Sequence, residues 1–447
     1  MRPDYRLEHA LILTMNSERE IISDGFIEIT GAAISAIGPM SELKHHPEPV
    51  SVLNLHDRLV MPGLINCHTH AAMTLLRGMA DDLPLDEWLR DYIWPAEAKF
   101  VTAGNVFLGT QLAIAEMFRS GTTMFADMYF FEEEVARACI DAGMRVLAGE
   151  AVVDFPSPSH ATPEDAITGI VRLAEKYNGN SLVNIAFAPH SIYACRKEIL
   201  ERIADESSKH AIPVHIHLAE TRGEVEKCFA DSGLRTVPFL QTTGLLNEHL
   251  IAAHMVHVDE EEAGIAASHD VKIAHNPSSN MKLSSGWAPM ELYSRIGITT
   301  GLGTDGTAAN NNLNLFNEMR MTALANKLVT GDPAAMPAQR AVEMATIGGA
   351  KVLGMDDRIG SLEQGKAADL LIARLDQPHL TPLYNIWSHI VYAMHSSDVE
   401  SLFINGRLVM HNHEILTMDV ASVMLEATKL HKHIEALIAT SLPHQIV

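Results

Sequence analysis

The chain has 447 residues, 47% of them hydrophobic, and its 33 Lys and Arg against 56 Asp and Glu give a formal net charge of −23. This length and apolar content suffice for one large domain and a smaller one, and the charge has the wrong sign for binding nucleic acid or an anionic membrane. Four dispersed cysteines without a C-x-x-C pair, no signal peptide at the N-terminus and no membrane-length apolar run predict a cytoplasmic protein.

Residues 1 to about 60 are predicted to form short strands separated by polar turns. The apolar stretches are Ala10–Thr14, Gly25–Ile29 and Ala33–Ile37. Their length and the turn residues between them are typical of β structure.

The next 300 residues alternate strand-like apolar runs with longer amphipathic stretches. Eight runs are expected to be strands: Val60–His68, Thr122–Met128, Arg145–Glu150, Val183–His190, Pro213–Leu218, Leu250–His254, Val271–His275 and Thr299–Thr304. Helices are expected between them, including Asn105–Arg119, Pro163–Tyr177, Lys197–His210 and Glu260–Ser268. This α/β alternation predicts a TIM-like (β/α)8 barrel. An open doubly wound sheet is the competing fold, but no G-x-G-x-x-G follows any strand.

Strands return near the C-terminus, at Gly365–Ala373 and Val399–Met410. We expect them to pair with the N-terminal strands as a composite β-sandwich. The predicted division is 1–60 with 361–415 for the sandwich, 61–360 for the barrel, and 416–447 for a C-terminal segment with an amphipathic helix from Val420 to Leu437.

Histidine and aspartate recur where the predicted barrel strands end. In a barrel, the catalytic groups come from the C-terminal strand ends and the loops that follow them. One such residue alone is better explained as a core histidine, but six of the eight strands end this way. The residues are His68, His70, His190, His217, His254, His275 and Asp305.

His68, His70, His217 and Asp305 would give a metal site of three histidines and one carboxylate. A divalent metal there lowers the pKa of a bound water to about 7. Zinc is the expected ion, with iron or manganese as alternatives. Glu220, three residues after His217, is placed to shuttle protons in the same cavity.

Two further His-x-His pairs are interpreted differently. His215 faces the same way as His217 but one layer deeper, so we predict a packed histidine or one that supports a ligand. His411 and His413 lie in a polar turn with Asn412 and Glu414, which indicates an exposed turn.

The motifs resemble those of the amidohydrolase superfamily, in its deaminase and chlorohydrolase branch. Within that branch the chain is similar to the 5′-methylthioadenosine/S-adenosylhomocysteine deaminases. The resemblance covers nearly the whole chain and is carried by Pro62–His70, Trp94–Glu97, Ala188–Ser191, His215–Glu220, Ala274–Met281, Gly301–Asp305 and Gly360–Leu371.

The resemblance implies a barrel with one divalent metal per chain, because the fourth strand ends in His190 where two-metal relatives carry a lysine. It implies catalytic roles for Glu220, His254 and Asp305, with His254 orienting the attacking hydroxide. It places Glu97 on the ribose hydroxyls and His190 beside the substrate, which Glu220 and Asp305 also contact. A homodimer or homotetramer is implied as well.

The reaction then expected is hydrolysis of a 6-aminopurine nucleoside, 5′-methylthioadenosine, to 5′-methylthioinosine and ammonia. Relatives that accept S-adenosylhomocysteine carry arginines around the third strand. The segment Leu147–Ala161 has no Arg or Lys, and Glu150 and Asp154 are expected to repel a carboxylate. Phe155 and methionines would line an apolar slot for the methylthio group.

Alternatives remain open on the same scaffold. They are deamination of S-adenosylhomocysteine, adenosine, guanine or cytosine, and dechlorination of an s-triazine. A non-catalytic scaffold protein is the alternative from another class, and the intact set of ligands with Glu220 argues against it.

Overall fold

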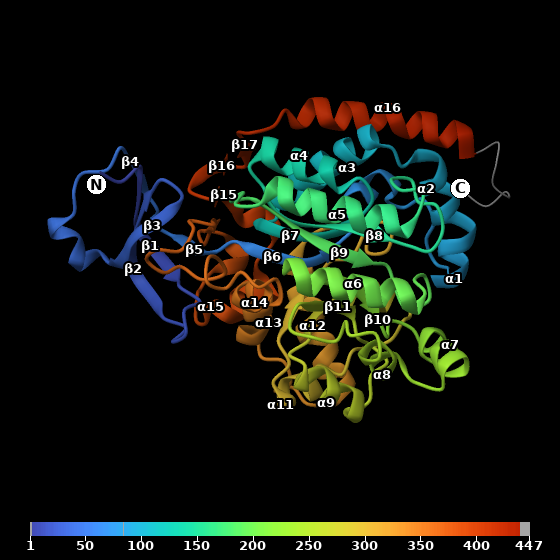
Figure 1. Ribbon diagram of the computed structural model, residues 1–447. Coiled ribbons are helices and arrows are strands. Elements are labelled where there is room, and N and C mark those ends of the chain that lie inside the picture. The colour runs from blue at the N-terminus through green and yellow to red at the C-terminus, as the bar shows by residue number, and fades with distance from the viewer. Residues whose placement is uncertain (1, 84, 439–447) are drawn as a thin grey trace.

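The computed structural model describes residues 2–83 and 85–438 and contains two sheets, as Figure 1 shows. The eight parallel strands of the first follow one another in chain order, from β6 to β13. Their bounds are β6 Leu64–Thr69, β7 Thr122–Tyr129, β8 Arg145–Val152, β9 Val183–Pro189, β10 Val214–Leu218, β11 Leu250–His254, β12 Lys272–His275 and β13 Thr300–Leu302. This ring confirms the predicted (β/α)8 barrel.

The first and last strands of the barrel meet beside the predicted metal ligands. Just beyond β13, the N–H groups of Thr304 and Asp305 donate to the carbonyl of His68, at 3.1 and 2.9 Å. The side chain of Asn66 binds Thr304 from the other strand, with 2.7 Å between its Nδ2 and the Thr304 Oγ1. The chain segments that carry His68 and Asp305 are therefore in direct contact.

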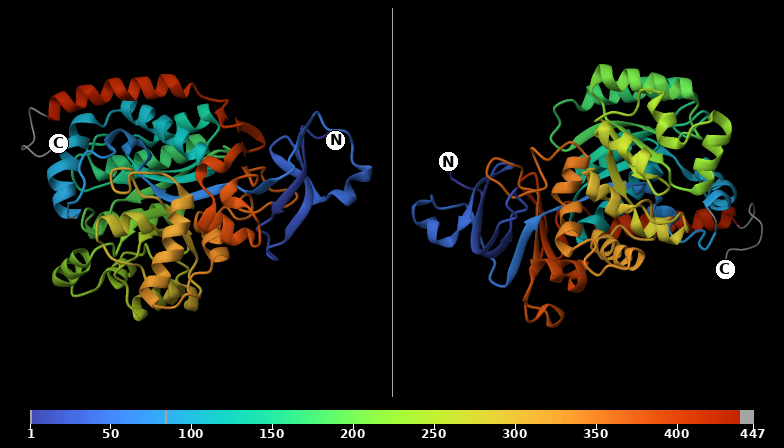
Figure 2. Two further views of the ribbon diagram at one scale, coloured as in Figure 1. Left: turned by 180° about the vertical axis from the view of Figure 1, so that it is seen from behind. Right: turned by 90° about the horizontal axis from the view of Figure 1, so that it is seen from below.

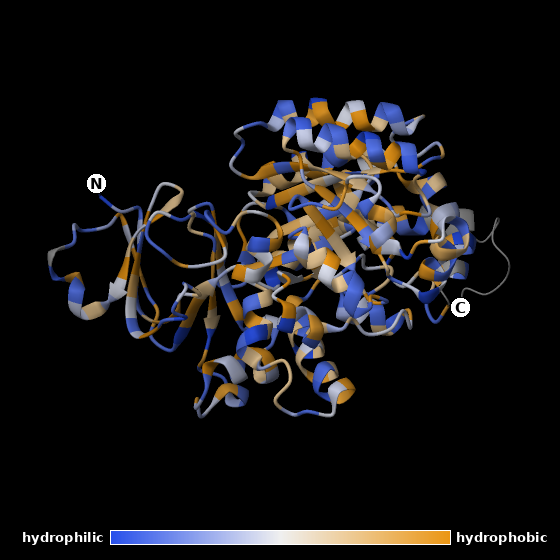
Figure 3. Ribbon diagram, turned by 60° about the horizontal axis from the view of Figure 1, so that its bottom comes forward, coloured by the Kyte–Doolittle hydropathy of each residue, from blue (hydrophilic) through white to orange (hydrophobic). Residues whose placement is uncertain are grey.

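Helices cover the outside of the barrel, and orange dominates its strands in Figure 3, where orange marks hydrophobic residues. The predicted helices are observed, three of them with the predicted bounds. The larger helices are α3 Ala103–Arg119, α4 Glu132–Ala142, α5 Pro163–Tyr177, α6 Lys197–His210, α7 Arg222–Ser232, α9 Glu260–Ser268, α11 Met290–Ile296, α12 Leu315–Thr330 and α13 Ala338–Met344. The shorter α8 Thr236–Gln241 and α10 Pro277–Lys282 lie between them in the chain, and α14 Ile347–Val352 follows α13.

The second sheet has nine strands and joins both ends of the chain. Its order is β17-β16-β15-β14-β5-β1-β2-β3, with β4 paired to β1. The bounds are β1 Tyr5–Leu13, β2 Ile21–Thr30, β3 Ala33–Pro39, β4 Ser51–Asn54, β5 Arg58–Pro62, β14 Leu370–Arg374, β15 Val399–Ile404, β16 Arg407–His411 and β17 Glu414–Ile415. Figure 2 shows the blue N-terminal strands beside the orange C-terminal segments in both views.

This sheet folds back on itself around its own core, as expected for the composite sandwich. Ala33 bridges Ala367, and Ile27, Ile372 and Phe403 are fully or almost fully buried inside. The domain boundaries given above stay a prediction. The C-terminal helix is observed as α16 Val420–Ile438, which lies along α3, and residues 439–447 of that segment lie outside the described residues.

One predicted strand is corrected. The run Val60–His68 is divided at Gly63 between β5 of the sandwich and β6 of the barrel. A Cβ at Gly63 would meet Thr123 at 2.1 Å, so only glycine fits at this crossing between the sheets. The run Val399–Met410 is a hairpin of β15 and β16, because Asn405 and Gly406 both have positive φ, as its tight turn requires.

Arg145 of β8 and Asp369, just before β14, form a buried ion pair between barrel and sandwich. The Nε–Oδ2 and Nη2–Oδ1 distances are 2.8 and 2.9 Å, and both side chains are 2% exposed. Asp369 also accepts the N–H of Asn405 at 2.7 Å. The contact between barrel and sandwich thus includes an ion pair that is buried from solvent.

Arg145→Met should lower the free energy of unfolding by about 3–5 kcal/mol, because it leaves the Asp369 carboxylate buried without its partner. Denaturant titration measures this. Arg295→Met is the matched control: its exposed pair with Glu260, at 2.9 Å, is worth below about 1 kcal/mol. Equal losses in the two variants would contradict the role given to the buried pair.

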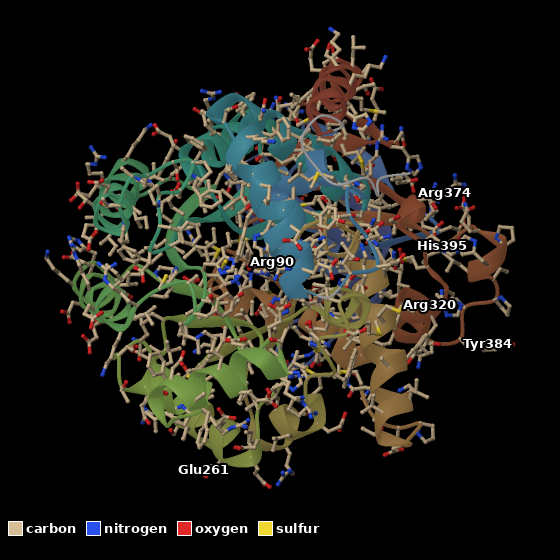
Figure 4. All side chains as sticks on the ribbon, turned by 90° about the vertical axis from the view of Figure 1, so that its right-hand side faces the viewer. Arg90, Glu261, Arg320, Arg374, Tyr384 and His395 are labelled. Carbon is tan, nitrogen blue, oxygen red and sulfur yellow. The ribbon has the colours of Figure 1, made fainter. Side chains whose placement is uncertain are left out.

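Between β6 and α3, short helical turns cross one end of the barrel. They are η2 Ala71–Leu76, α1 Leu85–Glu87, the π-helical η3 Trp88–Ile93 and α2 Trp94–Phe100. Figure 4 looks onto this end of the molecule, where Arg90 of η3 is labelled. Among the described residues, no helix is long and apolar enough to cross a membrane.

Candidate metal centre and active site

The residues predicted at the strand ends lie together at one end of the barrel. Among the described residues, two groups have ligand atoms within 4.8 Å of one another. One is His68, His70 and Asp305, and the other is His68, His217 and His254. The structure thus brings together the four predicted ligands around His68, and adds His254 beside them.

Within the first group, Asp305 Oδ1 lies 3.6 Å from His68 Nε2 and 3.2 Å from His70 Nε2. The backbone at Asp305 has φ +61°, a left-handed conformation that turns the chain directly after β13. Burial raises the carboxyl pKa, but the neighbouring His68 and His70 lower it by more, and the Asp305 pKa lies well below its usual value. Asp305 is therefore an anion.

The histidine hydrogen bonds orient their lone pairs toward this centre. The Nδ1 of His70 lies 2.5 Å from the Met128 carbonyl, and that of His217 lies 2.8 Å from the His190 carbonyl. A carbonyl only accepts, so each Nδ1 carries a proton, and Nε2 is the ring atom left to bind a metal.

His68 supplies the test of whether a metal fits. Its ring is fully buried, and its Nε2 has no hydrogen-bond partner among the described residues. Burial lowers its pKa to about 4, against the opposing effect of Asp305, so the ring is neutral. A buried, neutral and unpartnered imidazole nitrogen beside two other histidines and an aspartate fits a divalent metal.

His215 supports His68, as predicted from its deeper position. Its Nε2 lies 3.0 Å from His68 Nδ1, and its ring is fully buried. His275 is also fully buried, but both its ring nitrogens lack a partner among the described residues. It packs edge-on against Trp287, at 5.0 Å between ring centres, and belongs to neither group of ligands.

Glu220 lies after β10 with 7% of its surface exposed. Its Oε2 is 3.8 Å from His254 Nε2, and its Oε1 accepts from Ser285 Oγ at 3.4 Å. Burial raises the Glu220 pKa, partly offset by His254. A carboxyl group that holds its proton to higher pH than an exposed glutamate, beside the predicted metal ligands, is suited to proton transfer.

The backbone at Glu220 is held by a second carboxylate. Ala219 has φ +52°, and the N–H groups of Ala219 and Glu220 donate to Glu224, at 3.1 and 2.8 Å. Glu224 thereby fixes the turn that points Glu220 inward. The sequence offered no signal for this role beyond the four-residue spacing.

A cavity of about 400 Å³ opens above these residues and is lined by His70, His190, His217, Glu220, His254 and Asp305. Glu97 enters it from α2, hydrogen-bonded to Tyr129, and is 8% exposed. Burial raises the Glu97 pKa to about 7, against the effects of Tyr129 and His70. Burial also lowers the pKa of His190 to about 4, so this ring is neutral.

The outer part of the cavity is apolar. Trp94 and Phe155 face each other there, with ring centres 6.4 Å apart. None of the described residues that line the cavity is Lys or Arg. The remaining lining residues of this part include Leu85, Trp88, Leu89, Ile93, Val153, Pro156 and Pro158.

The prediction that Glu150 and Asp154 repel the carboxylate of a substrate is wrong. Neither lines the cavity. Glu150 accepts the N–H of Glu132 at 2.8 Å, and Asp154 pairs with Arg196 at 2.7 Å. The lack of a cation in the lining, and not these acids, disfavours an anionic group there.

His411 and His413 follow the prediction of a turn away from the site. Asn412 and His413 have positive φ, and His411 Nδ1 lies 3.0 Å from Ser401 Oγ. Sequence reasoning assigned no role to Tyr129, Ser279, Asn280, Ser285 or Glu224. Ser279 and Asn280 fall within the motif Ala274–Met281, which is the one signal that marked them.

Comparisons with known proteins agree with this geometry. The model of the amidohydrolase family matches residues 59–409. A 5-methylthioadenosine/S-adenosylhomocysteine deaminase of Syntrophobacter fumaroxidans is 46% identical over 95% of this chain and 96% of its own. One of Thermodesulfovibrio yellowstonii is 42% identical over 91% of this chain and 94% of its own.

Among solved structures, an adenosine deaminase of Xanthomonas campestris with bound zinc superposes with a TM-score of 0.95. It is 35% identical, over 97% of this chain and 99% of its own. An atrazine chlorohydrolase of Arthrobacter aurescens, complexed with zinc, reaches 0.89 at 23% identity, over 96% of this chain and 100% of its own. The second shares the fold.

Proposed function

The chain belongs to the amidohydrolase family, and from this premise we propose that it hydrolyses 5′-methylthioadenosine to 5′-methylthioinosine and ammonia. One observation carries the proposal. A single cavity combines the predicted metal ligands and Glu220 with Glu97 on its wall and an apolar outer part, and its described lining contains no Lys or Arg.

The residues of the centre fit one divalent metal per chain, held by His68, His70, His217 and Asp305. The buried, unpartnered Nε2 of His68 is the observation that supports this. Zinc is the proposed ion, with iron and manganese as alternatives. When bound, such an ion lowers the pKa of a water to about 7 and so supplies the nucleophile.

The protein residues then divide the proton transfers. Asp305, held as an anion, takes a proton from the attacking water, and His254 orients that water. Glu220 donates a proton to the ring nitrogen next to C6, which makes C6 more electrophilic. An oxygen–C6 bond forms, and Asp305 passes its proton to the exocyclic amine. The C6–N bond then breaks to release ammonia, while the new hydroxyl group returns a proton to Glu220 and leaves the C6 carbonyl.

Glu97 and His190 hold the nucleoside. Glu97 is placed to accept from the ribose hydroxyls, and its hydrogen bond to Tyr129 fixes its position between α2 and β7. His190 is neutral and presents its ring to the same cavity.

The 5′ substituent would lie in the outer, apolar part of the cavity. A methylthio group gains from contact with Trp94 and Phe155 there. S-adenosylhomocysteine would place an amino acid among the same residues, and no lining Lys or Arg pairs with its carboxylate. Arg196, after β9, is already bound by Asp154 and Glu164, at 2.7 and 2.8 Å.

We therefore expect kcat/KM for 5′-methylthioadenosine to exceed that for S-adenosylhomocysteine by at least about tenfold, equivalent to 1.4 kcal/mol. Ammonia release from the metal-replete enzyme measures both, with adenosine and guanine in the same panel. An equal or higher value for S-adenosylhomocysteine would overturn the preference. Turnover of guanine alone would overturn the proposed function.

We also propose a cytoplasmic homodimer or homotetramer. The four cysteines are buried free thiols, which fits a reducing compartment. Light scattering on the purified protein tests the assembly.

A further inference from the structure

The helix α10, directly after β12, places two consecutive polar residues on two different groups of the site. Ser279 and Asn280 are both fully buried. Ser279 contacts Asp305, and Asn280 contacts His254. Neither lines the substrate cavity, so any effect they have on the reaction passes through these two partners.

Ser279 orients the carboxylate of Asp305 from one side. Its Oγ lies 2.6 Å from Asp305 Oδ2, and since a carboxylate only accepts, the hydroxyl donates. The N–H of Gly306 donates to Oδ1 at 2.6 Å. The two bonds together fix the orientation of both carboxylate oxygens.

Asn280 determines the tautomer of His254. Its amide oxygen lies 2.8 Å from His254 Nδ1, and an amide oxygen only accepts, so Nδ1 carries the proton. In a neutral ring the lone pair then lies on Nε2. This atom is 4.0 Å from Asp305 Oδ2 and 3.8 Å from Glu220 Oε2. The Nδ2 of Asn276 is 3.4 Å from the same Nδ1, the longer and weaker contact.

The hydrogen bonds of Ser279 with Asp305 and of Asn280 with His254 run in opposite directions but have the same effect on the two partners. Ser279 donates and Asn280 accepts, and each leaves its partner with a lone pair toward the centre. A water between Asp305 Oδ2 and His254 Nε2 meets an acceptor for each of its protons. Its oxygen lone pair is then directed away from both, toward the electrophile.

The helix itself is anchored independently of these contacts. Pro277 occupies its first turn, and the N–H of Ser278 donates to Glu318 at 3.1 Å. Glu318 is fully buried on α12. Because one short, anchored helix holds both side chains, their two partners keep a fixed relative position.

We propose that Ser279 and Asn280 are positioning residues that hold Asp305 and His254 in a fixed orientation on either side of the attacking water. The inference rests on the proposed function for its kinetic consequence. The tautomer of His254 does not depend on the substrate, and it can be measured on the metal-free protein.

The test compares Asn280→Leu with Asn280→Asp. The side chains have similar size, but only aspartate retains an oxygen that accepts from Nδ1. For Asn280→Leu we expect kcat to fall about 10- to 100-fold, as for other residues that orient a site, with KM within about threefold. Asn280→Asp should be at least tenfold more active than Asn280→Leu. Metal content should stay that of the wild type in both.

The second readout is ¹⁵N NMR of histidine-labelled, metal-free protein, with the His254 signal assigned from its absence in His254→Ala. We expect the proton on Nδ1 in the wild type, and the Nε2–H form to appear in Asn280→Leu. Asn326→Leu is the control for loss of a buried asparagine away from the centre, and it should leave kcat and the His254 signal unchanged. If Asn280→Leu does not fold, Asn280→Ala takes its place.

Equal kcat in the leucine and aspartate variants, or an Nε2–H form in the wild type, would overturn the inference. A wild-type enzyme inactive on every nucleoside of the panel, with the proton still on Nδ1, would instead refute the proposed function and leave the positioning intact. The two failures are thus distinguishable.

Discussion

Glu220→Gln should retain the fold and the metal but lose turnover by about 10²- to 10⁴-fold, the usual contribution of a general acid–base group. Glutamine keeps the size of the side chain and an oxygen that can accept from Ser285. It cannot supply a proton to the purine ring or recover one afterwards. The loss is therefore expected in kcat, with little change in KM.

The raised pKa of Glu220 also predicts the direction of the pH dependence. Burial favours the protonated carboxyl, so Glu220 keeps the proton that the reaction uses at a pH where an exposed glutamate has lost it. Turnover should fall as the pH rises through this pKa. The alkaline limb should be absent from the residual activity of Glu220→Gln.

Steady-state ammonia release with metal analysis measures this prediction. Glu226→Gln is the matched control, because Glu226 is exposed on α7 and outside the cavity. Turnover of Glu220→Gln within a few fold of the wild type would refute the assigned role. Loss of metal from the variant would show that Glu220 acts as a ligand instead.

Removal of the metal should abolish turnover and destabilise the barrel end. We expect activity to drop more than about 10³-fold after chelation, because no residue of the site supplies hydroxide at neutral pH. One equivalent of zinc per chain should restore it. Zinc at about 1,000 times its Kd should also add about 4 kcal/mol to the free energy of unfolding.

Metal analysis and thermal denaturation of the same samples give the count and the stabilisation. His217→Ala should lose the ion, whereas His411→Ala, in the distant turn, should keep it. Two ions per chain in an active preparation would exclude the single-metal site. Full activity of the metal-free protein would exclude the mechanism.

Much of this fold was predictable from the sequence because the barrel repeats one pattern. The barrel strands are largely buried on both faces and read as apolar runs, α5 and α6 have amphipathic patterns, and α9 begins at a capping box formed by Asp259 and Glu262. The division at Gly63 was not predictable. Val60–His68 is apolar throughout, and only the approach of Thr123 in three dimensions shows why the chain changes sheets there.

The residues of the candidate site also differ in whether the sequence predicts them. That His68, His70, His217, Glu220 and Asp305 lie together was predictable, because each stands at or just after a strand end. Glu97 and His254 needed the resemblance for their roles. The contacts of Ser279, Asn280 and Tyr129 are made by small or neutral groups between distant segments, and composition and spacing carry no signal of which partner they meet.

The contact between the first and last barrel strands at His68 has a consequence for the synthesis and the unfolding of the protein. Because the chain closes its ring where His68 meets Thr304 and Asp305, the set of ligands exists only after the last strand has docked on the first. A ribosome-bound chain shorter than residue 305 lacks it. Capture of the proposed ion would therefore record completed ring closure, because opening of this junction separates His68 from Asp305.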